Sequence, residues 1–243
     1  MPPLILITRP IEAANSFAAR LAAELGPQAE ILLAPLMEIR QLPDLPALSV
    51  YRTLIFTSSH AVDAFAQATT CRDFTCYAVG KATGEKASAC GLSPIVGPGT
   101  GRELAIRIRN DAPATPCLHL RGDHVAFDIA GCLNSAGTET HDAIIYEQVP
   151  LPLPDDVIAR VLQAHTIVVP VFSPRSAQLL LDALPNGTNL QIAAISNAVA
   201  EVIPSAKAHR IEVAETPDGP AMLACVARLW SHANRLEGRD RPQ

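Results

Sequence analysis

The chain has 243 residues and a formal net charge of −5, with 19 basic and 24 acidic side chains. Apolar residues make up 49% of it, which excludes a disordered chain, and no apolar run approaches the roughly 20 residues of a membrane helix. Because aromatic residues make up only 4% and no basic stripe is present, we expect neither nucleic acid nor a membrane as a partner.

Six apolar runs predict buried parallel strands, and each is followed by a segment with helical spacing. The runs span residues 4–7, 53–56, 77–79, 117–120, 167–171 and 192–195. Strands that alternate with helices in this way predict an α/β fold. The length of the chain favours two domains.

Short signals mark where the predicted helices begin. Pro10 precedes the first helix and Ser58 the second. Late in the chain, Ser173 is the expected N-cap and Pro174 the first helical residue, because serine accepts hydrogen bonds from free N–H groups and proline lacks one. Alanine and leucine at helical spacing give this last helix one apolar face.

The segment YAVGKATGEKASACG (77–91) places Gly80 between a short strand and a helix of small residues. It fits neither the G-x-x-x-x-G-K-[ST] pattern nor the G-x-G-x-x-G pattern of nucleotide-binding turns. What remains is a helix start, whose free N–H groups and dipole attract a carboxylate as readily as a phosphate. We therefore expect an anion site at this turn.

A weak internal repeat organises the chain. Residues 4–26 and 117–137 each contain a strand, an arginine at its end, a helix and a closing glycine. Residues 53–68 resemble 168–184, and a second strand and turn follow each of them. This order predicts two similar α/β halves joined by proline-rich links. The sequence leaves open whether the halves are in tandem or one is inserted into the other.

Seven segments, taken in order, resemble uroporphyrinogen-III synthases: ITRP, IFTSSHAV, YAVGKATGEKASACGL, LHLRGD, IIYEQVPL, VFSPRSAQLLL and TPDGPAMLACV. The resemblance extends to about Trp230. It implies a cofactor-free hydro-lyase that closes the linear tetrapyrrole hydroxymethylbilane into uroporphyrinogen III, with inversion of ring D and loss of water. The pathway would be the biosynthesis of haem, sirohaem or cobalamin.

The resemblance also implies an architecture. Residues 1–38 and 150–238 would form one parallel-sheet α/β domain and 40–148 an inserted second one, with a two-segment hinge and the site in the cleft between them. We expect the charged tail RLEGRDRPQ, and residues 239–243 in particular, to be disordered. The cysteines lack C-x-x-C spacing, which suits a cytoplasmic protein. A monomer is expected, with channelling from hydroxymethylbilane synthase as an option.

In this family a tyrosine stands at the hinge, which makes Tyr146 the candidate proton donor, although a tyrosine that ends a strand is also an ordinary packing residue. No metal is expected, and none of the seven histidines is assigned catalysis. The residues expected to bind the substrate, several of which could equally be helix caps or form salt bridges, are Arg9, Thr57, Ser58, Ser59, Gly80, Lys81, Thr83, Arg121, Gly122, Ser173, Ser176, Ser196 and Asn197.

One turn departs from the family pattern. Residues 195–200 read ISNAVA where the family commonly has IGPTTA, so two hydroxyl positions are apolar here. Two alternatives therefore stay open. One is a non-catalytic module that binds a tetrapyrrole or another anion on the same frame, and the other is a small-molecule receptor of the flavodoxin or periplasmic-binding type.

Overall fold

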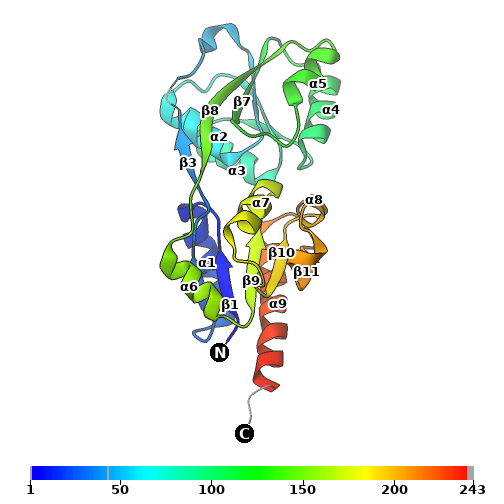
Figure 1. Ribbon diagram of the computed structural model, residues 1–243. Helices are drawn as coiled ribbons and strands as arrows, with labels where there is room; N and C mark the ends of the chain where they lie inside the picture. The colour runs from blue at the N-terminus through cyan, green and yellow to red at the C-terminus, as the bar shows by residue number, and fades with distance from the viewer. Residues whose placement is uncertain (1, 43, 240–243) are drawn as a thin grey trace. The chain divides into compact units, whose positions relative to one another are not determined.

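The computed structural model describes residues 2–42 and 44–239. As predicted, the protein is α/β, with two sheets in which parallel pairing dominates. The chain divides into two compact units, residues 1–38 with 150–243 and residues 39–149, here called the first unit and the inserted unit. Within the described residues, no helix is long and apolar enough to cross a membrane. Figure 1 follows the chain from β1 in blue to α9 in red.

The first unit has a five-stranded sheet in the order β11-β10-β9-β1-β2. Its strands are β1 (Leu4–Ile7), β2 (Glu30–Leu33), β9 (Ile167–Val171), β10 (Leu190–Ala194) and β11 (Arg210–Val213). Its helices are α1 (Ile11–Leu25), α6 (Asp155–Gln163), α7 (Pro174–Ala183), α8 (Asn197–Glu201) and α9 (Gly219–Arg239). A short 3-10 helix spans Ser205–Lys207.

Helices cover both faces of this sheet. On one face α1 and α9 pack through Phe17, Leu21 and Trp230, and on the other α6 and α7 pack through Val161 and Leu180. Because both faces are covered, β1, β9 and β10 are buried along their whole length. This explains why their apolar runs predicted strands correctly.

The inserted unit has a six-stranded sheet in the order β3-β8-β7-β4-β5-β6. Its strands are β3 (Met37–Gln41), β4 (Thr53–Phe56), β5 (Thr75–Ala78), β6 (Pro94–Val96), β7 (Cys117–Gly122) and β8 (Thr140–Pro150). Its helices are α2 (Ser59–Ala68), α3 (Lys81–Ala89), α4 (Gly101–Asp111) and α5 (Ile129–Ser135), with a 3-10 helix at Leu48–Val50. The chain crosses between the units within β3 and at the end of β8.

Two separate cores also lie on the faces of the second sheet. Val62 and Phe65 of α2 pack with β4 and β7 on one face. Leu104 and Ile108 of α4 pack with Leu133 of α5 on the other. The faces matter for the site, because alternate residues of a strand point to opposite faces.

The two sheets share one topology. If the inserted sheet is taken from β6 to β8, its order β6-β5-β4-β7-β8 corresponds strand by strand to β11-β10-β9-β1-β2. In this correspondence β4 and β9 are the first strands of one repeat type, and β7 and β1 those of the other. The topology thus agrees with the internal repeat in the sequence.

Two sequence expectations need correction. Strands β2, β3, β6, β8 and β11 were not among the six predicted runs, and most of their residues are partly buried or exposed. Tyr146 was expected to end a strand, whereas β8 continues to Pro150. The segment 235–239 is the end of helix α9 and not part of a disordered tail. Residues 240–243 lie outside the described residues.

Candidate functional site

The predicted site residues follow, or lie near the ends of, parallel strands. In each unit the carboxyl ends of neighbouring parallel strands meet at one edge of the sheet, which is where α/β proteins usually bind ligands. The first unit brings Arg9, Ser173, Ser176, Ser196 and Asn197 to this edge. The inserted unit brings Thr57, Ser58, Ser59, Gly80, Lys81, Thr83, Arg121, Gly122 and Tyr146 to its own.

Arg9 follows β1 and stacks on an aromatic ring. Its guanidinium carbon lies 3.9 Å from the centroid of Phe172, and Phe172 in turn meets Phe17 edge to face at 5.3 Å. Burial lowers the pKa of Arg9 from its ordinary value, yet arginine remains charged in proteins. Stacking fixes the plane of a guanidinium, and its N–H groups can then bind both oxygens of a carboxylate.

Ser173 is the N-cap of α7, as predicted. Its Oγ accepts a hydrogen bond of 3.0 Å from the Ser176 backbone N–H and lies 2.8 Å from Ser176 Oγ. The helix start at the equivalent turn before α8 is less well stabilised. Ser196 makes no side-chain cap hydrogen bond, and the helix that begins at Asn197 has only five residues. The turn that departs from the family pattern therefore also lacks the side-chain cap that the turn before α7 has.

In the inserted unit, α2 and α3 both begin at this edge. Ser58 caps α2 by accepting a hydrogen bond of 3.1 Å from the His60 N–H. Gly80 is the N-cap residue of α3, and a Cβ there would lie 3.2 Å from the Gly99 Cα atom. Lys81 is 89% exposed, whereas Thr83 is 7% exposed. The backbone of the Gly80 turn is therefore packed against a second loop.

Tyr146 lies on β8 and is only 3% exposed. Its ring belongs to the apolar core beneath α2, 5.8 Å from the ring of His60. The ring fills the space beside Gly122, where a Cβ would lie 2.5 Å from Tyr146 Cζ. The packing role that the sequence left open for Tyr146 is thus clear, and a donor role would add to it.

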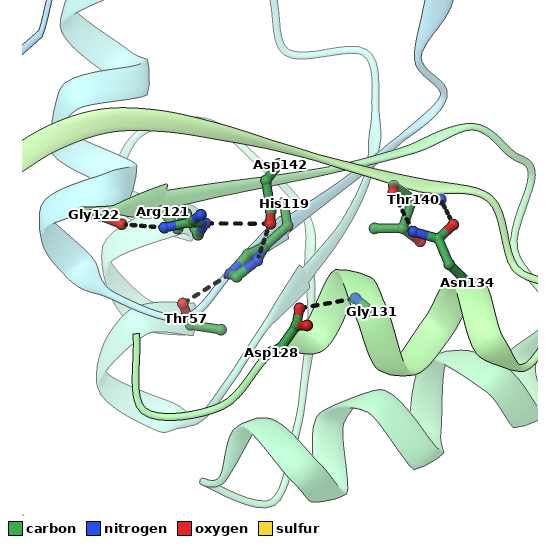
Figure 2. A network of polar contacts seen from close by, with 9 residues as sticks. All are labelled: Thr57, His119, Arg121, Gly122, Asp128, Gly131, Asn134, Thr140 and Asp142. Carbon is green, nitrogen blue, oxygen red and sulfur yellow. Dashed lines mark hydrogen bonds and ion pairs between the residues drawn. The ribbon is translucent and has the colours of Figure 1, made fainter. Parts of the chain in front are cut away.

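A polar chain centred on the buried His119 lies on the face of this sheet opposite Tyr146, and Figure 2 shows its side chains. His119 is 1% exposed, its Nε2 lies 3.0 Å from Thr57 Oγ1 and its Nδ1 lies 2.9 Å from Asp142 Oδ1. His119 and Asp142 are direct partners in the parallel pairing of β7 with β8. Sheet register therefore brings together residues that are far apart in sequence.

Arg121 is the fourth member of this network and contacts Asp142. Its Nε lies 3.3 Å from Asp142 Oδ2, and its Nη1 donates a hydrogen bond of 2.9 Å to the Gly122 carbonyl. Burial alone would raise the pKa of Asp142, but the hydrogen bond and charge of His119, followed by those of Arg121, outweigh it, so this pKa lies below its ordinary value. No role was predicted from the sequence for His119 or for Asp142.

The described residues contain no group of three or more His, Cys, Asp or Glu side chains placed to hold a metal ion. The two edges offer hydroxyls, backbone N–H groups, guanidinium groups and the polar chain around His119.

Comparison with known families identifies the family of the chain. A family model described as "Uroporphyrinogen-III synthase HemD" matches residues 16–224, most of the chain. The chain belongs to the uroporphyrinogen-III synthase HemD family. A sequence search among curated proteins finds no match.

Solved structures of this family share the fold. A uroporphyrinogen-III synthetase from Helicobacter pylori is similar with a TM-score of 0.64 at 16% identity, covering 94% of this chain and 100% of the other. A mutant uroporphyrinogen III synthase from Thermus thermophilus gives a TM-score of 0.61 at 15% identity, covering 95% of this chain and 99% of that one. At these identities the likeness to the structures shows the fold alone.

Proposed function

We propose that this chain is a uroporphyrinogen-III synthase, a cofactor-free hydro-lyase that closes hydroxymethylbilane with inversion of ring D and loss of water. Membership of the HemD family supports this proposal. The observation that carries it is that both sheets present strand-to-helix turns at their carboxyl edges. Three of these turns lead into helices of nine or ten residues, namely α2, α3 and α7.

The substrate explains why several such turns are useful. A linear tetrapyrrole with acetate and propionate arms is a flexible polyanion, so it needs several moderate anion sites and not one tight phosphate loop. Each helix start contributes about 0.3–1 kcal/mol towards an anion. Backbone N–H groups are local donors, so a net charge of −5 is compatible with an acidic ligand.

The proposed chemistry begins when the terminal C–O bond breaks and its electron pair leaves with the oxygen as water. The resulting azafulvene cation is attacked by the substituted carbon of the last ring, which gives a spiro intermediate that reopens and closes in the inverted orientation. Since uncatalysed closure gives the uninverted isomer, the enzyme's main task is to hold the chain of rings in one conformation.

We assign the proton donor for the departing water to Tyr146. A phenol has a proton to give, and positioned acids typically contribute about 10²–10⁴-fold. The ring is 3% exposed and packed on Gly122, so its contribution to packing has to be separated from its chemistry. Replacement by phenylalanine makes this separation, because it keeps the ring and removes the hydroxyl.

We further propose that the enzyme acts in the cytoplasm as a monomer. The polyanionic substrate does not cross a membrane unaided, so the enzyme that makes it, hydroxymethylbilane synthase, has to act in the same compartment. Direct transfer from that enzyme would shorten the lifetime of free hydroxymethylbilane, which closes spontaneously to the wrong isomer.

A second candidate function is a non-catalytic module that binds tetrapyrroles. The observation in its favour is the turn at 195–200, where Ser196 lacks a cap bond and α8 has five residues. Such a module would bind uroporphyrinogen III without producing it.

A coupled assay tests the two candidates. Porphobilinogen and its deaminase generate hydroxymethylbilane, and chromatography of the oxidised products separates isomers I and III. We expect the wild-type chain to shift the product from isomer I to isomer III in proportion to its concentration. Isomer I alone at every concentration, together with measurable binding of the product, would favour the non-catalytic module.

A further inference from the structure

The hydrogen-bonded chain Thr57–His119–Asp142 runs from the half-buried Thr57 through the buried His119 to the more exposed Asp142 (Figure 2). The positions of its hydrogen atoms decide what Thr57 can offer a ligand. Thr57 directly follows β4, so it stands at the carboxyl edge of the sheet, and it is half-buried. His119 lies behind it and is 1% exposed. Asp142 stands on β8 in direct register with His119.

The chemistry of the three groups fixes which of them donates. An ionised carboxylate can only accept, so Asp142 Oδ1 accepts from the His119 Nδ1–H. In the neutral imidazole the other nitrogen, Nε2, then carries a lone pair and no hydrogen. Nε2 therefore accepts, and the Thr57 hydroxyl is the donor of the hydrogen bond of 3.0 Å.

A hydroxyl that donates inward presents only lone pairs outward. Thr57 Oγ1 is therefore an acceptor towards the ligand, whereas a carboxylate arm would require a donor. The next residues have the opposite character, because Ser58 and Ser59 begin α2, where backbone N–H groups point outward. One turn thus presents an acceptor beside donors.

We propose that Thr57 Oγ1, oriented by His119 and Asp142, accepts a hydrogen bond from a pyrrole N–H of the substrate, while the start of α2 binds an acid arm of the same ring. This inference rests on the proposed function. Thr57 is then a catalytic residue, and His119 and Asp142 are positioning residues that act through it. No covalent bond of the protein is made or broken in this role.

The hydrogen bond between the pyrrole N–H and Thr57 Oγ1 would strengthen as the transition state forms. As the C–O bond of the substrate breaks, the pyrrole nitrogen supplies electron density and its N–H becomes positively charged. An acceptor fixed at that point stabilises the transition state more than the ground state. The negative charge of Asp142, transmitted through two hydrogen bonds, makes the Thr57 oxygen a better acceptor.

The direction of the chain can be measured without any substrate. Nitrogen-15 NMR of the intact protein, with the His119 ring assigned, distinguishes a nitrogen that carries hydrogen from one that does not. We expect a protonated Nδ1 and a bare Nε2. A ring protonated at Nε2 would overturn the proposal, because Thr57 would then be free to turn its proton outward.

The role in the reaction is tested with Thr57→Val and Thr57→Ser. The valine variant removes the acceptor and should lower kcat about tenfold to a hundredfold, the usual range for a hydrogen bond to a charged group, with KM nearly unchanged. The serine variant keeps the acceptor and should restore most of the rate. If valine disturbs folding, Thr57→Ala replaces it.

The matched control is Thr53→Val. Thr53 is the first residue of β4, is fully buried and donates to the Ala114 carbonyl at 2.8 Å. The same substitution there also removes one buried hydrogen bond, but at the other end of the strand, so kcat should stay near wild type. Equal kcat values for Thr57→Val and Thr53→Val would overturn the proposal. Absence of isomer III with the wild-type protein would instead refute the proposed function.

Discussion

A Cβ atom on Gly122 would lie 2.5 Å from Cζ of Tyr146 and 2.9 Å from its hydroxyl oxygen. The two residues are partners in the pairing of β7 with β8, next to a shift in register. The ring therefore occupies the space that a side chain at position 122 would need. The position of the proposed proton donor depends on a glycine.

Gly122→Ala should displace the Tyr146 ring. Overpacking of a filled core costs about 1–3 kcal/mol, and we expect a loss of unfolding free energy in this range together with reduced activity. Urea denaturation and the coupled isomer assay measure the two effects. A double-mutant cycle supplies the control, because Gly122→Ala should cost less stability in a Tyr146→Leu background, where no ring is present. Strictly additive losses would show that the ring is not what the new methyl group meets.

Arg9→Met should weaken substrate binding without changing the product. Methionine keeps much of the apolar packing on Phe172 but loses the charge, so a carboxylate arm would lose its partner. We expect KM to rise about tenfold to a hundredfold, with isomer III retained. Arg20→Met is the control, since Arg20 is exposed on α1 of the same unit. Similar KM values for the two variants would exclude a binding role for Arg9.

Asp142→Asn should change how stability depends on pH. The pKa of Asp142 is lower in the folded protein than its ordinary value, so the ionised carboxylate stabilises the fold above about pH 4. This stabilisation is lost as the pH falls through the folded-state pKa. Because Asp142 is exposed, solvent screens its contacts, so we expect wild type to be more stable than the variant at neutral pH by less than the roughly 1.5–3 kcal/mol of a hydrogen bond to a charged group. This difference in unfolding free energy should shrink in acid.

Urea denaturation between neutral pH and about pH 3 measures this gap. Glu85→Gln is the control, because Glu85 forms an exposed pair with Lys81 at 3.9 Å, and exposed pairs contribute little. A gap between wild type and Asp142→Asn that is independent of pH would contradict the assigned cause of the shift.

Much of the fold was predictable because the buried strands consist of consecutive apolar residues. The runs at 4–7, 53–56 and 167–171 coincide with β1, β4 and β9, which lie inside the sheets with both faces covered. In contrast, β2, β6 and β11 lie at sheet edges and are only partly buried. The prediction looked for fully buried strands and missed these three, although β2 (EILL) and β6 (PIV) are mostly apolar.

The candidate site was predictable where it depends on local signals. Ser173 and Ser58 stand where a helix start needs a cap, and both accept the expected backbone hydrogen bonds. His119 gives no such signal, since a single histidine in an apolar strand is usually a packing residue. Its partners are 62 and 23 residues away in sequence, and only the register of three neighbouring strands brings them together.

We propose that a fixed substrate conformation, more than any single acid, decides which isomer forms. The isomer ratio of Tyr146→Phe and Gly80→Val tests it most directly, with Gly84→Ala as a control for packing of the same helix against Val96. Valine at position 80 would push on the Gly99 backbone and displace the turn, and a displacement of about 1 Å can cost about 10²-fold. Circular dichroism verifies folding of each variant.

The account predicts that Tyr146→Phe slows turnover by at most about 10²–10⁴-fold and still makes isomer III, whereas Gly80→Val releases substrate that closes to isomer I and Gly84→Ala does not. If Tyr146→Phe abolishes isomer III while Gly80→Val keeps the wild-type ratio, a single essential acid controls the reaction and the account is wrong.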